Sequence, residues 1–408
     1  MKTAKPKLAV FTYLAGLVMI HMAVFWSLRH MVGKGYSDFT IYYCAGRIVR
    51  QGLGHQLYDD QTQFRVQQEF AREVSIRQGP LPFNHPPFEA LLFAPFSRVS
   101  YRVAFALWDL ANLAMLAALP LLLRPHLPGL KSYSWPFWML AMLAFFPIFL
   151  AMLQGQDAIL LLFLYTLSFV CLRKNRDAWA GCCLALGLFK FHLVVPFVLL
   201  LLAQGRKKVL YGFSLMAAVL AIISFAVVGG DAMISYPSYV LHLEGTKAGG
   251  AISPADMPNL RGILDIVLAP RPYFSAVVLT LSLGIVFFAA WQFHRSDNPN
   301  LFDLKFSLAA FATVLVSYHA LGYDLSILML PTLLLANELL RKGNFGEWPT
   351  LLITCAGAVL FFSPLPLLLS MRYGHLALMG SAVLLCMCGI AGEISFRTGY
   401  SYSPYDKI

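Results

Sequence analysis

Long apolar runs recur along most of the chain and alternate with short polar turns. An α-helix needs roughly 20 apolar residues to cross the hydrocarbon core of a bilayer. The pattern predicts an all-α polytopic membrane protein with about twelve transmembrane helices. We place them near residues 8–29, 100–123, 135–153, 156–172, 178–190, 191–203, 207–228, 273–293, 303–319, 324–340, 349–367 and 375–395.

The segments 178–190 and 191–203 are each short for a span. They form either a helical hairpin with a shallow tip or one long span. Counting them as two leaves the basic turns at 173–176, 206–208 and 341–342 on one side of the membrane. The positive-inside rule makes that side cytoplasmic, so we favour two segments.

The same rule places the Lys-containing N-terminus inside. The turns at 154–157 and 320–323 carry no Lys or Arg and face outside. We therefore expect one integral membrane domain over residues 1–408, with a first outer loop at 30–99 and a second at 229–272.

The first outer loop is the most polar part of the chain. It predicts helices over 38–51 and 60–77, and the second has apolar residues every fourth position between charged ones, as in amphipathic interfacial helices. Residues 79–87 carry four prolines and cannot continue a helix. The apolar segment 88–97 is too short to span and is read as re-entrant.

Composition supports the membrane class, since 59% of residues are hydrophobic and 12% are charged. The net charge of +11 does not indicate nucleic-acid binding, because the basic residues lie mostly at the ends of apolar runs. Seven cysteines show no metal-type spacing and lie mostly in apolar segments. Neither a disulfide framework nor a zinc site is indicated.

Asp38 follows the first predicted span by about one helical turn, where a carboxylate reaches water and lipid headgroups. The simplest interpretation is a helix N-cap for the 38–51 helix. The alternative is a catalytic base that acts on a lipid-linked substrate, and Tyr42 and Tyr43 suit the membrane interface beside it.

Other polar residues fall on the same outer side, which favours a site there. Each also has a structural interpretation, as a turn or as a snorkelling lysine, and Asp157, after Gln156, is most simply a helix N-cap. Asp109 lies inside a span and is expected to be structural, bonded to Asn112 or to another helix. The candidate substrate-binding residues are Tyr42, Tyr43, Asn84, His85, Gln154, Gln156, Lys190, His192, Asn259, Arg261, His319, Tyr323 and Asp324.

Six short motifs recur in order along residues 8–340. They are the Asp38-Phe39 to Tyr42-Tyr43 segment, Leu57-Tyr58-Asp59, His85 to Phe88, Gln154-Gly155-Gln156, Ala180 to Lys190, and His319 to Pro331. Together they resemble glycosyltransferase family 87, the bacterial polyprenyl-phosphate-mannose-dependent α-mannosyltransferases of the glycosyltransferase C superfamily. No single motif is specific, and the resemblance rests on their order and spacing. The family often has Tyr-Pro-Pro where this chain has Asn84-His85-Pro86-Pro87.

The resemblance implies a glycosyltransferase C-type fold in the bacterial inner membrane, with the active site facing outward. It implies an inverting transfer of mannose from a polyprenyl-phosphate donor to a lipid or glycan acceptor. It implies that Asp38 is the base and that His319 meets the donor phosphate.

Elementary chemistry agrees with that role. One carboxylate suffices to take the proton of an acceptor hydroxyl during inversion. The leaving phosphodiester needs no strong acid, and cations such as Lys190, Arg261 or His319 can hold it. No cofactor is expected, and no metal is required, since no pair of carboxylates close in sequence demands one. The expected partners are membrane lipids, the donor and the acceptor.

Two other functions stay open. A transporter or flippase for lipids or lipid-linked sugars should carry charges at the membrane midplane, broken helices and internal repeats. A related ligase would use a diphosphate-lipid donor, and only an assay separates it from the transferase.

Overall fold

The computed structural model describes residues 4–71, 81–245, 253–268, 271–295, 298–342, 345–373 and 376–400, and within these ranges every regular element is helical. The α-helices are α1 Ala4–Gly33, α2 Phe39–Arg50, α3 Asp60–Gln68, α4 Pro87–Phe93, α5 Tyr101–Leu123, α6 Trp135–Leu143, α7 Phe146–Gln154, α8 Ala158–Arg173, α9 Asp177–Leu186, α10 Phe191–Ala203, α11 Lys208–Gly245, α12 Leu260–Leu268, α13 Phe274–His294, α14 Phe302–Val316, α15 Met329–Lys342, α16 Glu347–Phe361, α17 Leu365–Tyr373 and α18 Leu378–Tyr400. Short 3-10 helices are η1 Gly54–Gln56, η2 Phe96–Arg98, η3 Pro128–Leu130, η4 Leu188–Lys190, η5 Pro254–Asp256, η6 Pro299–Leu301 and η7 Gly322–Leu328.

In the described part of the chain, 7 helices are long and apolar enough to cross a membrane, or up to 10 if each bent pair is one span. Helix α8, Ala158–Arg173, is apolar but shorter. Large apolar side chains of α1, α11 and α13 face outward, as expected for contact with lipid. The prediction of a polytopic, all-helical membrane protein is confirmed, while the count of about twelve and the glycosyltransferase C-type fold stay predictions.

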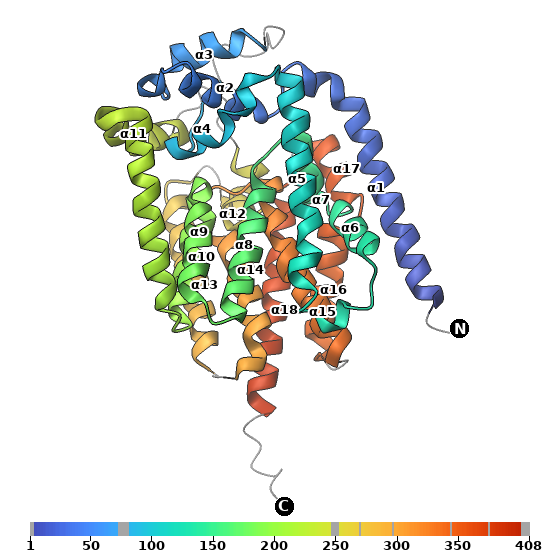
Figure 1. Ribbon diagram of the computed structural model, residues 1–408. Coiled ribbons are helices and arrows are strands. Elements are labelled where there is room, and N and C mark those ends of the chain that lie inside the picture. The colour runs from blue at the N-terminus through green and yellow to red at the C-terminus, as the bar shows by residue number, and fades with distance from the viewer. Residues whose placement is uncertain are drawn as a thin grey trace, which may run out of the picture.

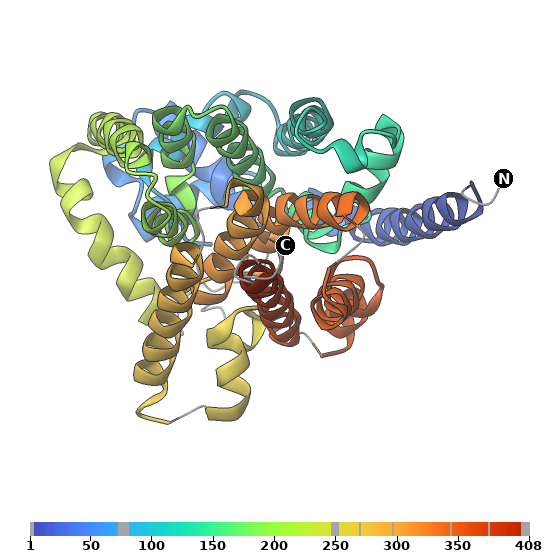
Figure 2. The same cartoon turned by 90° about the horizontal axis from the view of Figure 1, so that it is seen from below.

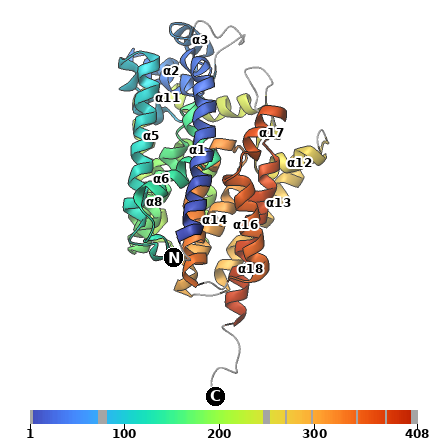
Figure 3. The same ribbon diagram turned by 90° about the vertical axis from the view of Figure 1, so that its right-hand side faces the viewer.

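The long helices run side by side, and α2, α3 and α4 cover one end of the bundle (Figure 1). The N-terminal end of α1 and the C-terminal end of α18 lie toward the opposite end of the bundle, so both face the same side of a membrane. Seen from below, α1 lies at the edge of the bundle (Figure 2). Figure 3 shows α1 between α5 on one side and α16 to α18 on the other. This arrangement puts the first outer loop over one end of the bundle.

In the first outer loop, one helix is shorter than predicted. Helix α2 follows the predicted 38–51 range closely, but α3 ends at Gln68 rather than at residue 77. The Gln67 amide bonds both the C=O and the N–H of Leu81, at 2.7 and 3.0 Å, and ties the end of α3 to the segment before α4. Residues 72–77 of the predicted helix lie outside the described residues.

The segment predicted as one span at 135–153 consists of α6 and α7, which meet at a bend of 72°. Pro147 lies in the first turn of α7, where its missing N–H costs no helical hydrogen bond. The bend brings the end of α7, Gln154, beneath the first outer loop, since the Gln154 side chain bonds the Asp38 backbone.

Helices α9 and α10 form a hairpin. Arg206, just after α10, pairs with Asp177 at the start of α9 at 3.1 Å, so the ends of the two helices away from the tip lie together. The tip between them is η4, which ends at Lys190. The hairpin interpretation therefore agrees with the contacts, and the basic residues at 206–208 return to the side of Arg173 and Asp303, which also form an ion pair.

Helix α11 begins as a span and ends as part of the outer cover. Gly229, with φ 79°, interrupts it at the predicted end of the span. The backbone oxygen of Val227 lies 2.0 Å from where a Cβ on Gly54 would be, so only glycine permits this approach. Beyond the break, the Tyr236 hydroxyl donates to the Asn84 carbonyl oxygen at 3.1 Å.

Candidate functional site

Asp38 stands at the N-cap position of α2, but its side chain makes no capping hydrogen bond. Its Oδ2 instead accepts from the Gln156 Nε2 at 2.8 Å, and its backbone N–H donates to the Gln154 Oε1 at 3.1 Å. Asp59 differs, since it caps α3 by accepting from the Thr62 N–H at 2.8 Å. The Asp38 carboxylate is therefore directed toward the α7–α8 turn rather than toward its own helix.

Gln156 connects Asp38 to the rest of the cluster. Its Oε1 accepts from the Tyr42 hydroxyl at 2.7 Å and from the Lys190 Nζ at 3.5 Å. Its backbone oxygen accepts from the Trp108 Nε1 at 3.3 Å. With both ends of the amide bonded, Gln156 is fixed and holds the Asp38 carboxylate in one orientation.

The turn before α8 depends on Gly155. This residue is left-handed, with φ 61°, and a Cβ there would lie 2.8 Å from atoms of Phe39 and of Phe105. Glycine alone combines this backbone with this contact. The turn brings Gln154, Gln156 and Asp157 together beneath α2.

Lys190, at the hairpin tip, is buried between two carboxylates. Its Nζ lies 2.9 Å from the Asp157 Oδ1 and 2.8 Å from the Asp324 Oδ1. Asp324 also accepts from the Leu321 N–H through Oδ2, at 2.8 Å. The ammonium thus joins the hairpin, the start of α8 and η7, and its charge is balanced by the protein itself.

Tyr42 lies among the acidic groups. Burial and then the charges of Asp157 and Glu89 hold the pKa of the Tyr42 hydroxyl well above its usual range. The hydroxyl therefore keeps its proton and acts as a hydrogen-bond donor to Gln156. Its ring also meets the edge of the His85 ring, with centroids 5.2 Å apart.

His85 and Glu89 form a buried pair next to Asp157. The His85 Nδ1 lies 2.7 Å from the Glu89 Oε2 and 3.7 Å from the Asp157 Oδ2. Burial, together with the Asp157 charge, raises the pKa of Glu89 to about 7 against the opposing effect of His85. Burial lowers the pKa of His85, but the charges of Glu89 and Asp157 outweigh it, so the pKa is raised. The three side chains also have the residue types of a metal site.

Sequence reasoning missed Glu89 and gave Asp157 a capping role. Asp157 does occupy the N-cap of α8, but its side chain makes no capping bond there. Glu89 is a lone carboxylate in the apolar segment Pro86 to Phe93, and it lies four residues after His85. An isolated carboxylate in an apolar segment is costly, and this was the available signal.

Several predicted site residues bond elsewhere. The Tyr43 hydroxyl donates to the Val99 carbonyl oxygen at 2.7 Å, away from the cluster. Asn84 is joined to α11 through its backbone. The Asn259 side chain donates to the Ser317 carbonyl oxygen at 2.8 Å and accepts from the Gly262 N–H at 3.0 Å. These contacts fix the outer segments, so in this structure the three residues support the site from its surroundings.

A second group of predicted residues surrounds the loop from Ser317 to Leu321. The Arg261 guanidinium donates to the Tyr318 carbonyl oxygen at 3.2 Å and covers the Tyr318 ring at 4.1 Å. The rings of His192 and His319 lie 5.9 Å apart. Tyr323, on the same segment, is an electrostatic neighbour of Asp38. The loop thus connects the cationic and imidazole groups to the cluster around Asp38.

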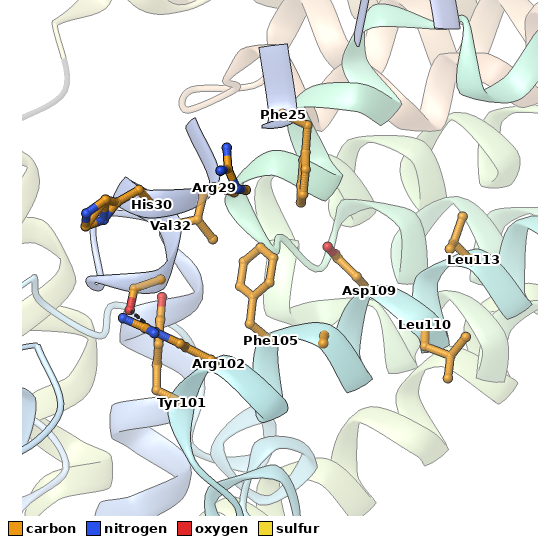
Figure 4. A pocket seen from close by; sticks show the side chains of 12 residues that line it. Phe25, Arg29, His30, Val32, Tyr101, Arg102, Phe105, Asp109, Leu110 and Leu113 are labelled. Atoms are coloured by element: carbon orange, nitrogen blue, oxygen red, sulfur yellow. Dashed lines mark hydrogen bonds between the residues drawn. The ribbon is translucent and has the colours of Figure 1, made fainter. Parts of the chain in front are cut away.

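Asp109 lies beside Asn112 on α5, and the expected hydrogen bond between their side chains is not formed in the structure. It also lines a cavity of about 830 Å³ between α1 and α5. Figure 4 shows Arg29, His30 and Arg102 in one part of this cavity and the apolar side chains of Leu110 and Leu113 in another. Phe105 lines the cavity and packs against Phe39 at 5.4 Å, which places the cavity beside the helix that carries Asp38.

Comparison with known proteins adds the family. Residues 83–317 match the family model for glycosyltransferase family 87. No curated protein and no solved structure matches the chain. The match contains His85, Glu89, Asp157 and Lys190, while Asp38 precedes it and Asp324 follows it. Because the match covers more than half of the chain and agrees with the resemblance of its motifs, this protein belongs to glycosyltransferase family 87 and is a membrane glycosyltransferase.

Proposed function

We propose that this glycosyltransferase moves mannose from a polyprenyl-phosphate donor to a lipid or glycan acceptor at the outer face of the bacterial inner membrane. The observation that carries the proposal is the orientation of Asp38. A carboxylate at an N-cap position makes no capping bond and is held by a fixed amide inside a buried polar cluster. Such positioning suits a general base.

In the proposed step, Asp38 takes the proton of the acceptor hydroxyl. The hydroxyl oxygen forms a bond to the anomeric carbon while the bond from that carbon to the phosphate oxygen breaks. The phosphate leaves with the electron pair as polyprenyl phosphate, and the configuration at the anomeric carbon inverts. The proton on Asp38 is then lost to water.

The donor phosphate requires positive or hydrogen-bonding groups. Lys190 is less suited to this role than the sequence indicated, because Asp157 and Asp324 already balance its charge. We assign the phosphate to Arg261, His319 and His192, which lie around one loop. The cavity between α1 and α5 offers apolar contacts for a lipid chain, with Arg29 and Arg102 beside them.

The location of the polar residues supports an enzyme over a transporter. The acidic cluster gathers beneath the outer cover formed by α2 and α4, rather than being spread through the bundle. A transporter would instead be expected to carry its charges near the membrane midplane.

The test is incubation of membranes that contain the protein with radiolabelled polyprenyl-phosphate mannose and a lipid extract. We expect a labelled glycolipid whose rate of formation falls at least about a hundredfold when Asp38→Asn replaces the wild type. A panel of other polyprenyl-phosphate sugars and a diphosphate-lipid donor is run in parallel. Label transfer from the diphosphate donor alone would favour the ligase, and transfer from no donor would overturn the proposal.

A further inference from the structure

Three side chains near Asp38, the half-buried His85 and the buried Glu89 and Asp157, have the composition and spacing of a metal site. The ligand atoms of His85, Glu89 and Asp157 all lie within 4.8 Å of one another. The His85 Nδ1 is 2.7 Å from the Glu89 Oε2 and 3.7 Å from the Asp157 Oδ2. Metal–ligand bonds of about 2.1 Å place neighbouring ligand atoms roughly 3 Å apart. Small side-chain movements would bring the three atoms onto one ion.

Few cations or hydrogen-bond donors reach the carboxylate oxygens of this cluster in the described part of the chain. Glu89 is 1% exposed and Asp157 is fully buried. The Glu89 carboxylate contacts the His85 imidazole and the Asp157 carboxylate, and the second of these carries the same charge. A buried carboxylate without enough partners is strongly destabilising. A cation between Glu89 and Asp157 would satisfy these oxygens.

The charge of the whole cluster points the same way. Four carboxylates, those of Asp38, Glu89, Asp157 and Asp324, surround the site, while its cations are Lys190 and His85, if the imidazole is protonated. The site is therefore negative before an anionic phosphate donor enters it. A divalent ion would offset this charge and make phosphate binding favourable.

The surrounding groups hold the three side chains in place. Lys190 binds the Oδ1 of Asp157 and leaves the Oδ2 directed toward His85. The His85 ring is held between Tyr42 at 5.2 Å and Phe83 at 5.7 Å. Glu89 follows four residues later in the first turn of α4, which begins at Pro87. Such supporting contacts are what orient the ligands of protein metal sites.

We propose that His85, Glu89 and Asp157 bind one divalent metal ion, with Mn²⁺ as the representative of ions that accept mixed nitrogen and oxygen ligands. Binding displaces the hydrogen shared by His85 and Glu89. The remaining coordination positions would take a phosphate oxygen of the donor, and this last step rests on the proposed function. The proposal adds a metal ion, which the sequence analysis did not require.

The first experiment measures the metal directly. The purified full-length protein is treated with a chelator, dialysed and titrated with Mn²⁺, and free Mn²⁺ is followed by electron paramagnetic resonance. We expect one ion per chain for the wild type and at least a tenfold weaker affinity for Glu89→Gln and for His85→Asn. Glu69→Gln is the matched control, because Glu69 pairs with Arg47 outside the cluster, and it should bind as the wild type does.

The proposal would be overturned if the wild type bound no more Mn²⁺ than Glu89→Gln. It would also be overturned if both variants eluted from a sizing column as the wild type does and bound Mn²⁺ with wild-type affinity. The second experiment measures donor binding with and without Mn²⁺ in Asp38→Asn, which lacks the base and keeps the three ligands. Metal binding without transfer from any donor would contradict the proposed function alone. If the protein binds no Mn²⁺, and a chelator changes neither donor binding nor sugar transfer, the metal site alone would be contradicted.

Discussion

The chemistry of this enzyme depends on where single side chains point. Asp38 and Asp59 both stand at helix N-caps in the first outer loop, but only Asp59 caps its helix. The free energy that a capping bond supplies is typically about 1 kcal/mol. Asp38 forgoes this contribution and bonds to Gln156, which indicates that its carboxylate serves a purpose other than stabilising α2.

We predict that Asp38→Asn folds normally and binds the donor, while its turnover falls at least about a hundredfold, because asparagine keeps the shape but cannot take a proton. The measurement is initial rate and donor affinity of the purified protein in nanodiscs. Asp59→Asn is the matched control and should keep wild-type activity, since asparagine caps about as well as aspartate. Activity of Asp38→Asn within a fewfold of the wild type would remove Asp38 from the mechanism.

Arg261 is the second residue with a defined test. If it binds the donor phosphate, Arg261→Ala loses a charged hydrogen bond of roughly 1.5–3 kcal/mol. We therefore predict an increase of about tenfold to a hundredfold in the KM for the lipid donor, with a smaller effect on turnover. Arg271→Ala, a change in the exposed segment before α13, is the control. An unchanged KM in Arg261→Ala would exclude a contact between Arg261 and the donor phosphate and leave Arg261 a structural role beside Tyr318.

At the scale of elements, the site is the meeting point of helix ends and turns. The tip of the α9–α10 hairpin, the turn before α8 and the start of η7 meet at Lys190. An ion pair of this kind is costly to break from one side, because the partner charges stay buried. Lys190 is thus part of the framework of the site.

We predict that Lys190→Met lowers the thermal stability of the detergent-solubilised protein by the equivalent of about 3–5 kcal/mol. Methionine has a similar length but leaves Asp157 and Asp324 without their cation. Adding Asp157→Asn and Asp324→Asn should restore much of the loss, which a simple packing defect would not allow. Lys207→Met, in the exposed turn after α10, should have little effect. Equal melting temperatures for Lys190→Met and Lys207→Met would contradict the prediction.

The sequence predicted individual helices better than the contacts between them. Apolar length and basic turns predicted most of the long helices, and the range of α2, because each signal is local. Asp38, Gln156, Lys190 and Asp324 were singled out by their position on one side of the membrane, and the structure joins them through hydrogen bonds and ion pairs. Which polar residues meet across segments was beyond the sequence, and this explains why Glu89 was missed.

Local pattern was misleading where tertiary contacts determined the outcome. The apolar period predicted a helix to residue 77, but α3 ends at Gln68, next to the point where the Gln67 side chain bonds the backbone of Leu81. Tyr43 follows Tyr42 directly, and on a helix adjacent residues point about 100° apart. Tyr42 therefore faces Gln156 while Tyr43 faces Val99.

At the scale of the whole molecule, the N-terminal end of α1 and the C-terminal end of α18 lie on one side, opposite the cover formed by α2, α3 and α4 (Figure 1). We predict that this shared side is cytoplasmic, as the positive-inside rule requires. A cysteine at Gln51, which is exposed in the cover, should react with an impermeant maleimide on intact cells or spheroplasts. A cysteine at Asn175, exposed between α8 and α9, should react only after permeabilisation.

The protein with its native cysteines alone is the control for background labelling, since Cys355 and Cys388 are exposed. Labelling of Asn175→Cys from outside, or failure to label Gln51→Cys, would contradict the orientation. Either result would also move the site around Asp38 to the other side of the membrane.

The contact between α11 and the first outer loop has a consequence for biosynthesis. The Tyr239 hydroxyl contacts Gln63 at 3.3 Å, and Gly54 fits only against the Val227 backbone. Translation proceeds at roughly 5–20 residues per second, so the partners on α11 emerge on the order of ten seconds or more after the loop. Asp324 follows later still. During this interval the newly made first outer loop lacks its contacts with α11. A chain arrested before α11 would display an acidic, unfinished site to the quality-control proteases of the membrane.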